Sequence, residues 1–342
     1  MRYYSLSPAS VLPLIVWVIA LSVPLTIAAQ QPNRGGSVGK GHRATPKVRF
    51  DSGNSALRIP LEIDNNIILM RLRVNNSKPL KFIFDTGASI SVISSKGAAD
   101  LGLKTQGRFR GDATGGKIEG SAIKRVVLSV QGAQVSDQTI AAIPFPTPPG
   151  FEFDGIIGYD FISQFVVEID YPQKIMNLYS PQTYHYSGAG TSIPLLLVGR
   201  KTPMATLEIS LDGRATITAN LEVDTGADNT FLLNSPFVKR HKFVERMENT
   251  TQESRNGAGG EQRVIVGRVK AVRLGPFILN NPPIFLSLDT EGSGASEEND
   301  GVIGGEIFRR FKLILDYSRK QMILEPNKNF NDPYDLEQGA TG

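Results

Sequence analysis

The stretch Phe84-Asp85-Thr86-Gly87-Ala88-Ser89 decides how this sequence folds, because it recurs later as Val223-Asp224-Thr225-Gly226-Ala227-Asp228. Two further pairs of segments recur in the same order: Ala113-Thr114-Gly115-Gly116 with Gly257-Ala258-Gly259-Gly260, and Asp154-Gly155-Ile156-Ile157-Gly158 with Asp300-Gly301-Val302-Ile303-Gly304. A single Asp-Thr-Gly occurs by chance in roughly one chain of this length in fifteen, whereas three matched pairs in one order are not explained by chance. The sequence therefore predicts an internal duplication.

Both halves carry the patterns of short strands and tight turns. Ile67 to Val74 alternates apolar residues with Arg, which is typical of a strand. Leu207 to Leu211 leads through Asp212-Gly213 into Ala215 to Val223, which predicts a hairpin with a two-residue turn. Only four short helices are expected, at Lys96 to Leu101, Asp160 to Phe165, Ser235 to His241 and Glu306 to Phe311. We predict an all-β fold of two tandem lobes related by a pseudo-two-fold axis.

The first 54 residues differ in composition from the rest of the chain. Arg2 precedes an apolar stretch over residues 11–29 that ends in small residues, so residues 1–29 are expected to be a signal peptide or a membrane anchor. Residues 30–54 are rich in Gly, Ser, Pro and basic side chains, which predicts a basic flexible linker. We expect export to the periplasm or beyond the cell, with a possible membrane tether through residues 11–29.

The remaining boundaries follow from the repeats. The expected units are an N-terminal lobe over 55–182, a linker over 183–192, a C-terminal lobe over 193–328 and a polar tail over 329–342.

Composition narrows the chemistry. The chain of 342 residues has no Cys and three His, which removes thiol nucleophiles and leaves little material for a metal site, so no metal and no cofactor are expected. The net charge of +4 comes from a leader that holds six basic residues and no acidic one over positions 1–50. No nucleic-acid partner is therefore expected, and carboxylates must carry any acid/base step.

The repeated motif supplies such carboxylates. Asp85 and Asp224 each follow an apolar strand and enter a turn in which Gly allows close backbone approach. One such Asp is more often structural, but two that a duplication relates are expected to meet where the halves join. Two adjacent carboxyls share one proton and so act together as acid and base.

These motifs, each followed by an apolar-apolar-Gly segment, resemble those of the aspartic proteases. The Ala after each Asp-Thr-Gly and the Gly-Gly segments are similar to those of the retropepsin-like branch. The whole chain is similar to exported bacterial proteins that carry two fused retropepsin-like units. The resemblance implies acid-protease-like β-barrel lobes and a catalytic dyad of Asp85 and Asp224. It also implies two supporting groups: the dyad-supporting residues Thr86, Gly87, Thr225 and Gly226, and the flap residues Gly115, Gly116, Gly259 and Gly260 that close over the substrate.

The function this predicts is an aspartic endopeptidase that cleaves a peptide or protein substrate with water and forms no covalent intermediate. Because one chain carries both half-sites, a monomer is expected. The alternative is a non-catalytic peptide-binding or scaffold protein that keeps the fold.

Specificity is expected to differ between the two sides of the cleft. The segment from Ile143 to Phe153 is rich in Phe and Pro, and either forms an apolar wall or only packs. The segment from Leu286 to Asp300 is acidic, and either favours a basic substrate residue or points into solvent.

Overall fold

Strands dominate the computed structural model, which describes residues 46–113, 116–144, 151–199, 202–257 and 259–334. The predicted signal peptide and residues 30–45 of the predicted linker lie outside these ranges. The all-β class with a few short helices is confirmed. Among the described residues, no helix is both long and apolar enough to cross a bilayer.

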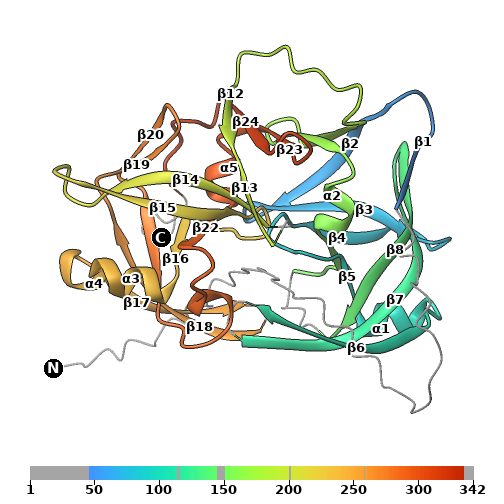
Figure 1. The fold of residues 1–342 in the computed structure, drawn as a ribbon, viewed down its shortest axis with the longest axis horizontal. Helices are drawn as coiled ribbons and strands as arrows, with labels where there is room; N and C mark the ends of the chain where they lie inside the picture. Colours follow the sequence, from blue (N-terminus) through green and yellow to red (C-terminus); the bar gives the residue numbers. More distant parts are fainter. Residues whose placement is uncertain (1–45, 114–115, 145–150, 200–201, 258, 335–342) are drawn as a thin grey trace, which may run out of the picture.

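The N-terminal half lies on the right in Figure 1 and the C-terminal half on the left. The N-terminal elements are β1 (Lys47–Phe50), β2 (Ser55–Asp64), β3 (Ile67–Val74), β4 (Leu80–Phe84), β5 (Val92–Ser94), α1 (Ser95–Asp100), β6 (Thr105–Ala113), β7 (Gly116–Val130), β8 (Ala133–Ile143), β9 (Gly155–Ile157), α2 (Tyr159–Ile162), β10 (Val166–Asp170) and β11 (Ile175–Tyr179). 

The C-terminal half repeats this order of elements with small changes. Its elements are β12 (Thr191–Pro194), β13 (Leu196–Val198), β14 (Thr202–Ser210), β15 (Thr216–Val223), β16 (Phe231–Leu233), α3 (Ser235–His241), α4 (Phe243–Arg246), β17 (Thr251–Gly257), β18 (Gly260–Arg268), β19 (Ala271–Leu274), β20 (Phe277–Asn280), β21 (Pro283–Ser287), the 3-10 helix η1 (Ser293–Ala295), β22 (Gly301–Ile303), α5 (Gly305–Phe308), β23 (Phe311–Asp316) and β24 (Gln321–Pro326). 

Equivalent strands of the two halves pair in the same way. β4 runs parallel to β9, and β15 runs parallel to β22. β5 is antiparallel to β9, and β16 is antiparallel to β22. Each Asp-Thr-Gly turn therefore leaves the end of a strand that is held on one side by the apolar-apolar-Gly segment of its own half.

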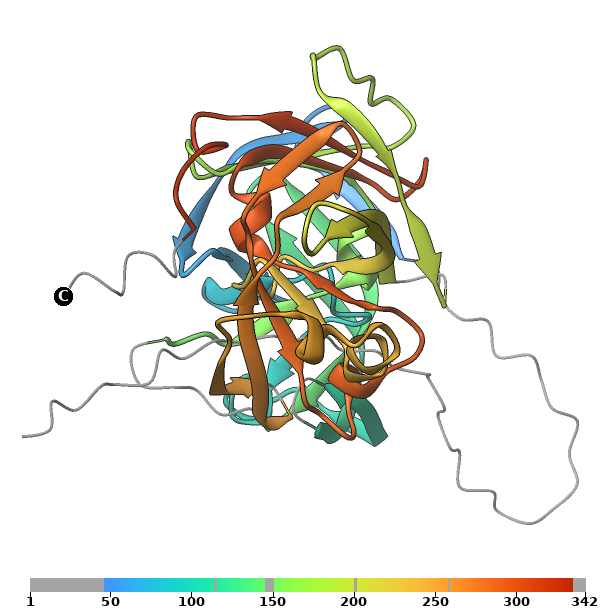
Figure 2. The ribbon, with the colours of Figure 1, turned by 90° about the vertical axis from the view of Figure 1, so that its left-hand side faces the viewer.

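The last two strands of each half lie together in one sheet, flanked by β12, the first strand of the C-terminal half, and by β2, in the order β12-β24-β23-β10-β11-β2. From β2 the sheet continues through β3 and β4 into the rest of the N-terminal half. Figure 2 shows β2, β12, β23 and β24 together along the top of the molecule. In the central β10–β23 pair, Val166 lies opposite Asp316, Asp170 lies opposite Lys312, and Glu168 lies opposite Ile314 midway between them. Asp170 and Asp316 are equivalent residues of the two halves, and each lies opposite the first part of the other strand. The pairing is therefore the same for both halves.

Strand β1 corrects the predicted linker, because residues 47–50 are not a flexible tether. They pair along their whole length with β8, from Lys47 opposite Ser136 to Phe50 opposite Ala133. The Phe50 ring also packs edge-on against Phe165, with centroids 5.8 Å apart. Main-chain pairing to an available strand edge needs few apolar side chains, so composition alone did not reveal this strand.

Residues 329–334 of the predicted polar tail dock on the C-terminal half. Arg310 is 1% exposed and donates to the carbonyl oxygens of Phe330, Asp332 and Pro333. Its guanidinium also lies 4.3 Å from the centre of the Tyr334 ring. The five N–H donors of a buried Arg need acceptors, and the tail supplies three of them.

Two smaller expectations differ from the structure. The predicted two-residue turn at Asp212-Gly213 is a longer loop, since Ser210 pairs with Thr216. Within it, Asp212 Oδ1 accepts a hydrogen bond from the Arg214 N–H at 2.9 Å, which the ladder would otherwise use. β12 also begins inside the predicted linker over 183–192 and pairs with β24.

Candidate active site

The two Asp-Thr-Gly turns occupy equivalent positions in the pairing of the strands. The backbone N–H of Asp85 donates to the Ile157 carbonyl at 3.0 Å, and that of Asp224 donates to the Ile303 carbonyl at 3.0 Å. Both aspartates thus leave their strands where the second repeated segment of the same half ends. The short parallel pairing fixes the direction in which each carboxyl points.

Each turn holds one oxygen of its own carboxyl. Asp85 Oδ1 accepts from the N–H groups of Gly87 and Ala88 at 2.8 and 2.9 Å. Asp224 Oδ1 accepts from the N–H of Gly226 at 2.8 Å. The other oxygen, Oδ2, is buried in both residues and has no hydrogen-bond partner among the described part of the chain. The two unpartnered oxygens are the atoms left for a bound molecule.

The turns pack directly on each other. A Cβ atom added to Gly87 would lie 2.7 Å from Asp224 Cγ, and one added to Gly226 would overlap Asp85 Cγ in the same way. Glycine is therefore required at both positions by the carboxyl of the opposite half. Asp85 and Asp224, each fully buried, meet at this contact.

Thr86 and Thr225 lie beneath the carboxyls and exchange hydrogen bonds. The Thr225 N–H donates to Thr86 Oγ1 at 3.0 Å, and the Thr86 N–H donates to Thr225 Oγ1 at 3.2 Å. Each hydroxyl then donates across the junction, from Thr86 to the Val223 carbonyl and from Thr225 to the Phe84 carbonyl. This buried and reciprocal network fixes one turn relative to the other.

Burial and mutual repulsion raise the pKa values of the two carboxyls to different extents. Burial first, and then the charge of Asp224, hold the pKa of Asp85 well above its ordinary value. Burial raises the pKa of Asp224 to about 6, against the effects of the neighbouring Asp85 carboxyl and of nearby backbone N–H groups, which favour its charged form. The pair therefore holds one proton on Asp85 while Asp224 is ionised, which provides an acid beside a base.

A third acidic residue, Glu222, was not anticipated from the sequence. It lies two residues before Asp224 in β15 and is only 4% exposed. Burial and the charge of Asp224 raise its pKa well above the usual range, and its Oε2 accepts from Asn299 at 3.3 Å. A Glu between Leu221 and Val223 in an otherwise apolar strand end was the available signal.

Two hairpins carry the predicted flap residues. Gly116 ends the β6–β7 turn, and Gly259 and Gly260 end the β17–β18 turn, while Gly115 lies outside the described residues. The tips meet, because a Cβ atom added to Gly259 would lie 2.6 Å from Gly116 N. Figure 1 shows these hairpins together along the bottom of the molecule. 

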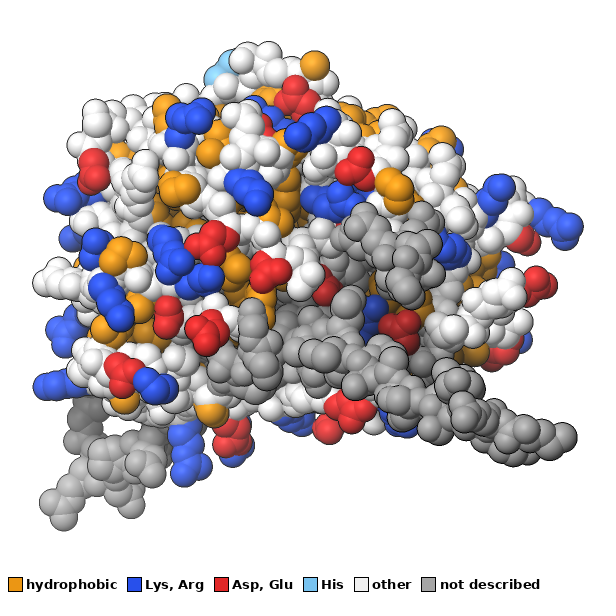
Figure 3. Space-filling view, turned by 180° about the vertical axis from the view of Figure 1, so that it is seen from behind, with side chains coloured by type: hydrophobic (Ala, Val, Ile, Leu, Met, Phe, Trp, Pro, Cys, Tyr) orange, Lys and Arg blue, Asp and Glu red, His pale blue; other side chains and the backbone are white. Residues whose placement is uncertain are grey.

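Among the described residues there is no group of three His, Asp or Glu side chains that could hold a metal ion. On the face drawn in Figure 3, basic and acidic side chains are interspersed. 

Taken together, a mostly β protein in which two duplicated turns present a coupled carboxyl pair defines a site of the aspartic-peptidase kind. The comparison with known families agrees. The model of the family described as aspartyl protease matches residues 70–161 and 207–307, which is more than half of the chain. The protein belongs to this family, and each matched region contains one Asp-Thr-Gly turn, so the predicted resemblance to two fused units is confirmed. No curated protein matches the sequence.

Proposed function

We propose that this protein is an aspartic endopeptidase whose catalytic dyad is Asp85 and Asp224. The observation that carries the proposal is the meeting of these two buried carboxyls, one from each half, with both Oδ2 atoms unpartnered among the described residues. A water molecule bound between those oxygens would satisfy them and would stand next to both an acid and a base.

In the proposed reaction, ionised Asp224 takes a proton from the water as the water oxygen attacks the scissile carbonyl carbon. Protonated Asp85 donates its proton to the carbonyl oxygen, which gives a neutral tetrahedral gem-diol. Asp85 then takes back a hydroxyl proton while Asp224 delivers its proton to the leaving nitrogen, and the C–N bond breaks. The pair ends with one proton, as it began, and no covalent enzyme intermediate forms.

The substrate is proposed to be an extended stretch of peptide or protein that passes between the dyad and the two flap hairpins. Nucleic acid is not a proposed partner. One chain holds both half-sites, so the active form is proposed to be a monomer, exported and with a possible tether through residues 11–29.

The test is an Asp85→Asn variant incubated with a generic peptide library beside wild type. We expect wild type to cleave and the variant to lose at least a thousandfold in rate, since the pair no longer holds a removable shared proton. Asp212→Asn, in an exposed loop, is the matched control and should retain full activity. Cleavage-free binding of peptides by wild type would instead support the scaffold alternative.

A further inference from the structure

The two flap hairpins differ at a matched pair of positions. In the C-terminal hairpin, Gly257 pairs with Gly260 next to the tip, and Arg255 pairs with Gln262 two residues farther along. In the N-terminal hairpin the pair at the same distance from the tip is Gly111 with Ile118. An apolar residue in one flap is thus replaced by a charged and an amide side chain in the other.

Arg255 and Gln262 lie on the inner face of their hairpin. Arg255 is 9% exposed and Gln262 is 1% exposed, whereas their neighbours Glu261 and Arg263 are exposed on the opposite face. The Arg255 guanidinium lies 3.9 Å from the centre of the Phe285 ring. This face therefore points toward the body of the C-terminal half and not toward solvent.

Contacts connect this face to the candidate dyad. Phe285 belongs to a small apolar cluster that also holds Val264 from the same hairpin and Ala227. Ala227 is the residue that follows the Asp224 turn. Arg255 therefore contacts Phe285, and Phe285 belongs to the same apolar cluster as Ala227, next to the Asp224 turn.

The charge of Arg255 is poorly compensated. Its only ion pair among the described residues is with Glu253 Oε2 at 3.3 Å, and the Glu253 side chain is 39% exposed. Its Nε–H is buried and has no partner in the described part of the chain. Buried charges are normally paired and fully hydrogen-bonded, so this guanidinium retains capacity for a further carboxylate.

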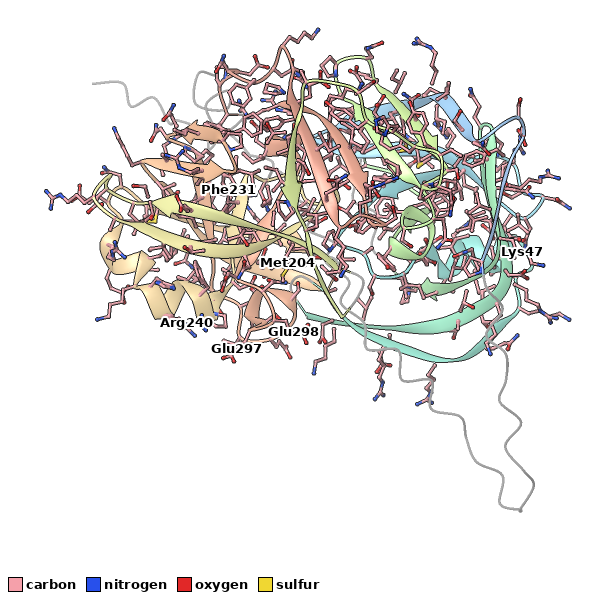
Figure 4. All side chains as sticks on the ribbon, turned by 45° about the horizontal axis from the view of Figure 1, so that its top comes forward. Lys47, Met204, Phe231, Arg240, Glu297 and Glu298 are labelled. Atoms are coloured by element: carbon pink, nitrogen blue, oxygen red, sulfur yellow. The ribbon has the colours of Figure 1, made fainter. Side chains whose placement is uncertain are left out.

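The acidic segment from Leu286 to Asp300 does not provide a carboxylate for Arg255. Asp289 Oδ2 accepts a hydrogen bond from Gln262 Nε2 at 2.7 Å and is occupied by it. Figure 4 shows Glu297 and Glu298 beside Arg240, along the lower rim of the C-terminal half. Both glutamates are exposed, where salt screens their charges, and neither forms an ion pair with Arg255.

We propose that Arg255 forms a subsite for an acidic side chain of the substrate, Asp or Glu, on the C-terminal side of the site. This rests on the proposed peptidase function and adds its specificity. The substrate carboxylate would accept hydrogen bonds from the Arg255 guanidinium above Phe285. On the side of the N-terminal flap hairpin, where Ile118 lies at the matching position, the site would take an apolar residue.

The test measures binding, so that it holds whether or not the protein cleaves. Asp85→Asn protein is titrated with three peptide pools that are identical except for Glu, Gln or Lys at the fixed positions, at a pH where Glu is ionised. One fixed position should show binding roughly tenfold or more tighter for Glu than for Gln, the range expected for a hydrogen-bonded charge.

Adding Arg255→Met should remove the preference and leave binding of the Gln pool within about threefold, whereas the matched change Arg263→Met on the outer face should retain it. Arg255→Lys keeps the positive charge but loses the paired N–H donors of the guanidinium, so it should retain part of the preference for Glu. Circular dichroism confirms that each variant is folded. Equal binding of Glu and Gln pools at every position, or a preference that survives Arg255→Met, would overturn the proposal.

Discussion

Both Asp-Thr-Gly turns are followed by an alanine at the position where a hydroxyl would reach the outer carboxyl oxygen. The side chains of Ala88 and Ala227 offer no donor, and the Oδ2 atoms of Asp85 and Asp224 are left without a partner among the described residues. A donor to the ionised form would lower the pKa of the pair, so its absence acts in the same direction as burial. From the sequence alone this argument places the optimum at about pH 4 to 6; burial of both groups adds to the shift.

We predict that activity rises with pH through an apparent pKa of about 6, because Asp224 must lose its proton before it can act as the base. Below that value both carboxyls are protonated, and the reaction has no base. Ala227→Ser should move this acidic limb to lower pH, roughly by one unit, since the new hydroxyl stabilises the charged form. The measurement is the pH profile of kcat/KM for both proteins. Full wild-type activity at pH 3 would contradict the assignment.

At the scale of elements, the proposed function requires the two flap hairpins to move so that a substrate can enter. Their tips touch through backbone atoms at Gly116 and Gly259, and a side chain at either position would separate them. The acidic segment also contributes here, because a Cβ atom added to Gly292 would lie 2.9 Å from Gly116 N. The closed arrangement therefore depends on glycines in three segments.

Gly259→Ala is predicted to lower kcat/KM by about tenfold while changing the melting temperature little. The added methyl meets backbone atoms of Gly116 where the two hairpins touch, so it disturbs closure more than folding. Gly213→Ala, in the β14–β15 loop, is the control: its φ of 83° strains an alanine and should lower the melting temperature, but the loop lies outside the flap hairpins, so activity should stay at the wild-type level. A variant with unchanged kcat/KM would show that contact between the tips is not needed for turnover.

At the scale of the whole molecule, the repeated segments predicted the mostly β class and the meeting of the two turns. They did so because each repeat carries its own strand, turn and Gly signals, which are local in sequence. The pairing of β10 with β23, the strand β1 and the docking of residues 329–334 on Arg310 were not predicted. These features depend on long-range contacts between segments of ordinary composition, which local patterns do not encode.

The candidate site divides in the same way. Asp85, Asp224 and their supporting Thr and Gly residues were found because the motif occurs twice. Glu222 and Arg255 have no counterpart in the other half, where Ile83 stands two residues before Asp85 and Gly111 stands in the flap. Comparing the two halves reveals only the residues that they share. Residues that occur in one half alone, such as Glu222 and Arg255, were recognised only in the structure.

The central claim is that the two halves form one site with one shared proton. The most direct measurement is kcat/KM for Asp85→Asn, Asp224→Asn and the double variant, on one peptide and at several enzyme concentrations. We predict that both single variants lose activity to the level of the double variant, because either change removes the whole acid/base pair. Wild-type activity per molecule should not change on dilution, since both carboxyls belong to one chain. A single variant that keeps most of its activity, or a wild type that loses activity on dilution, would contradict the claim.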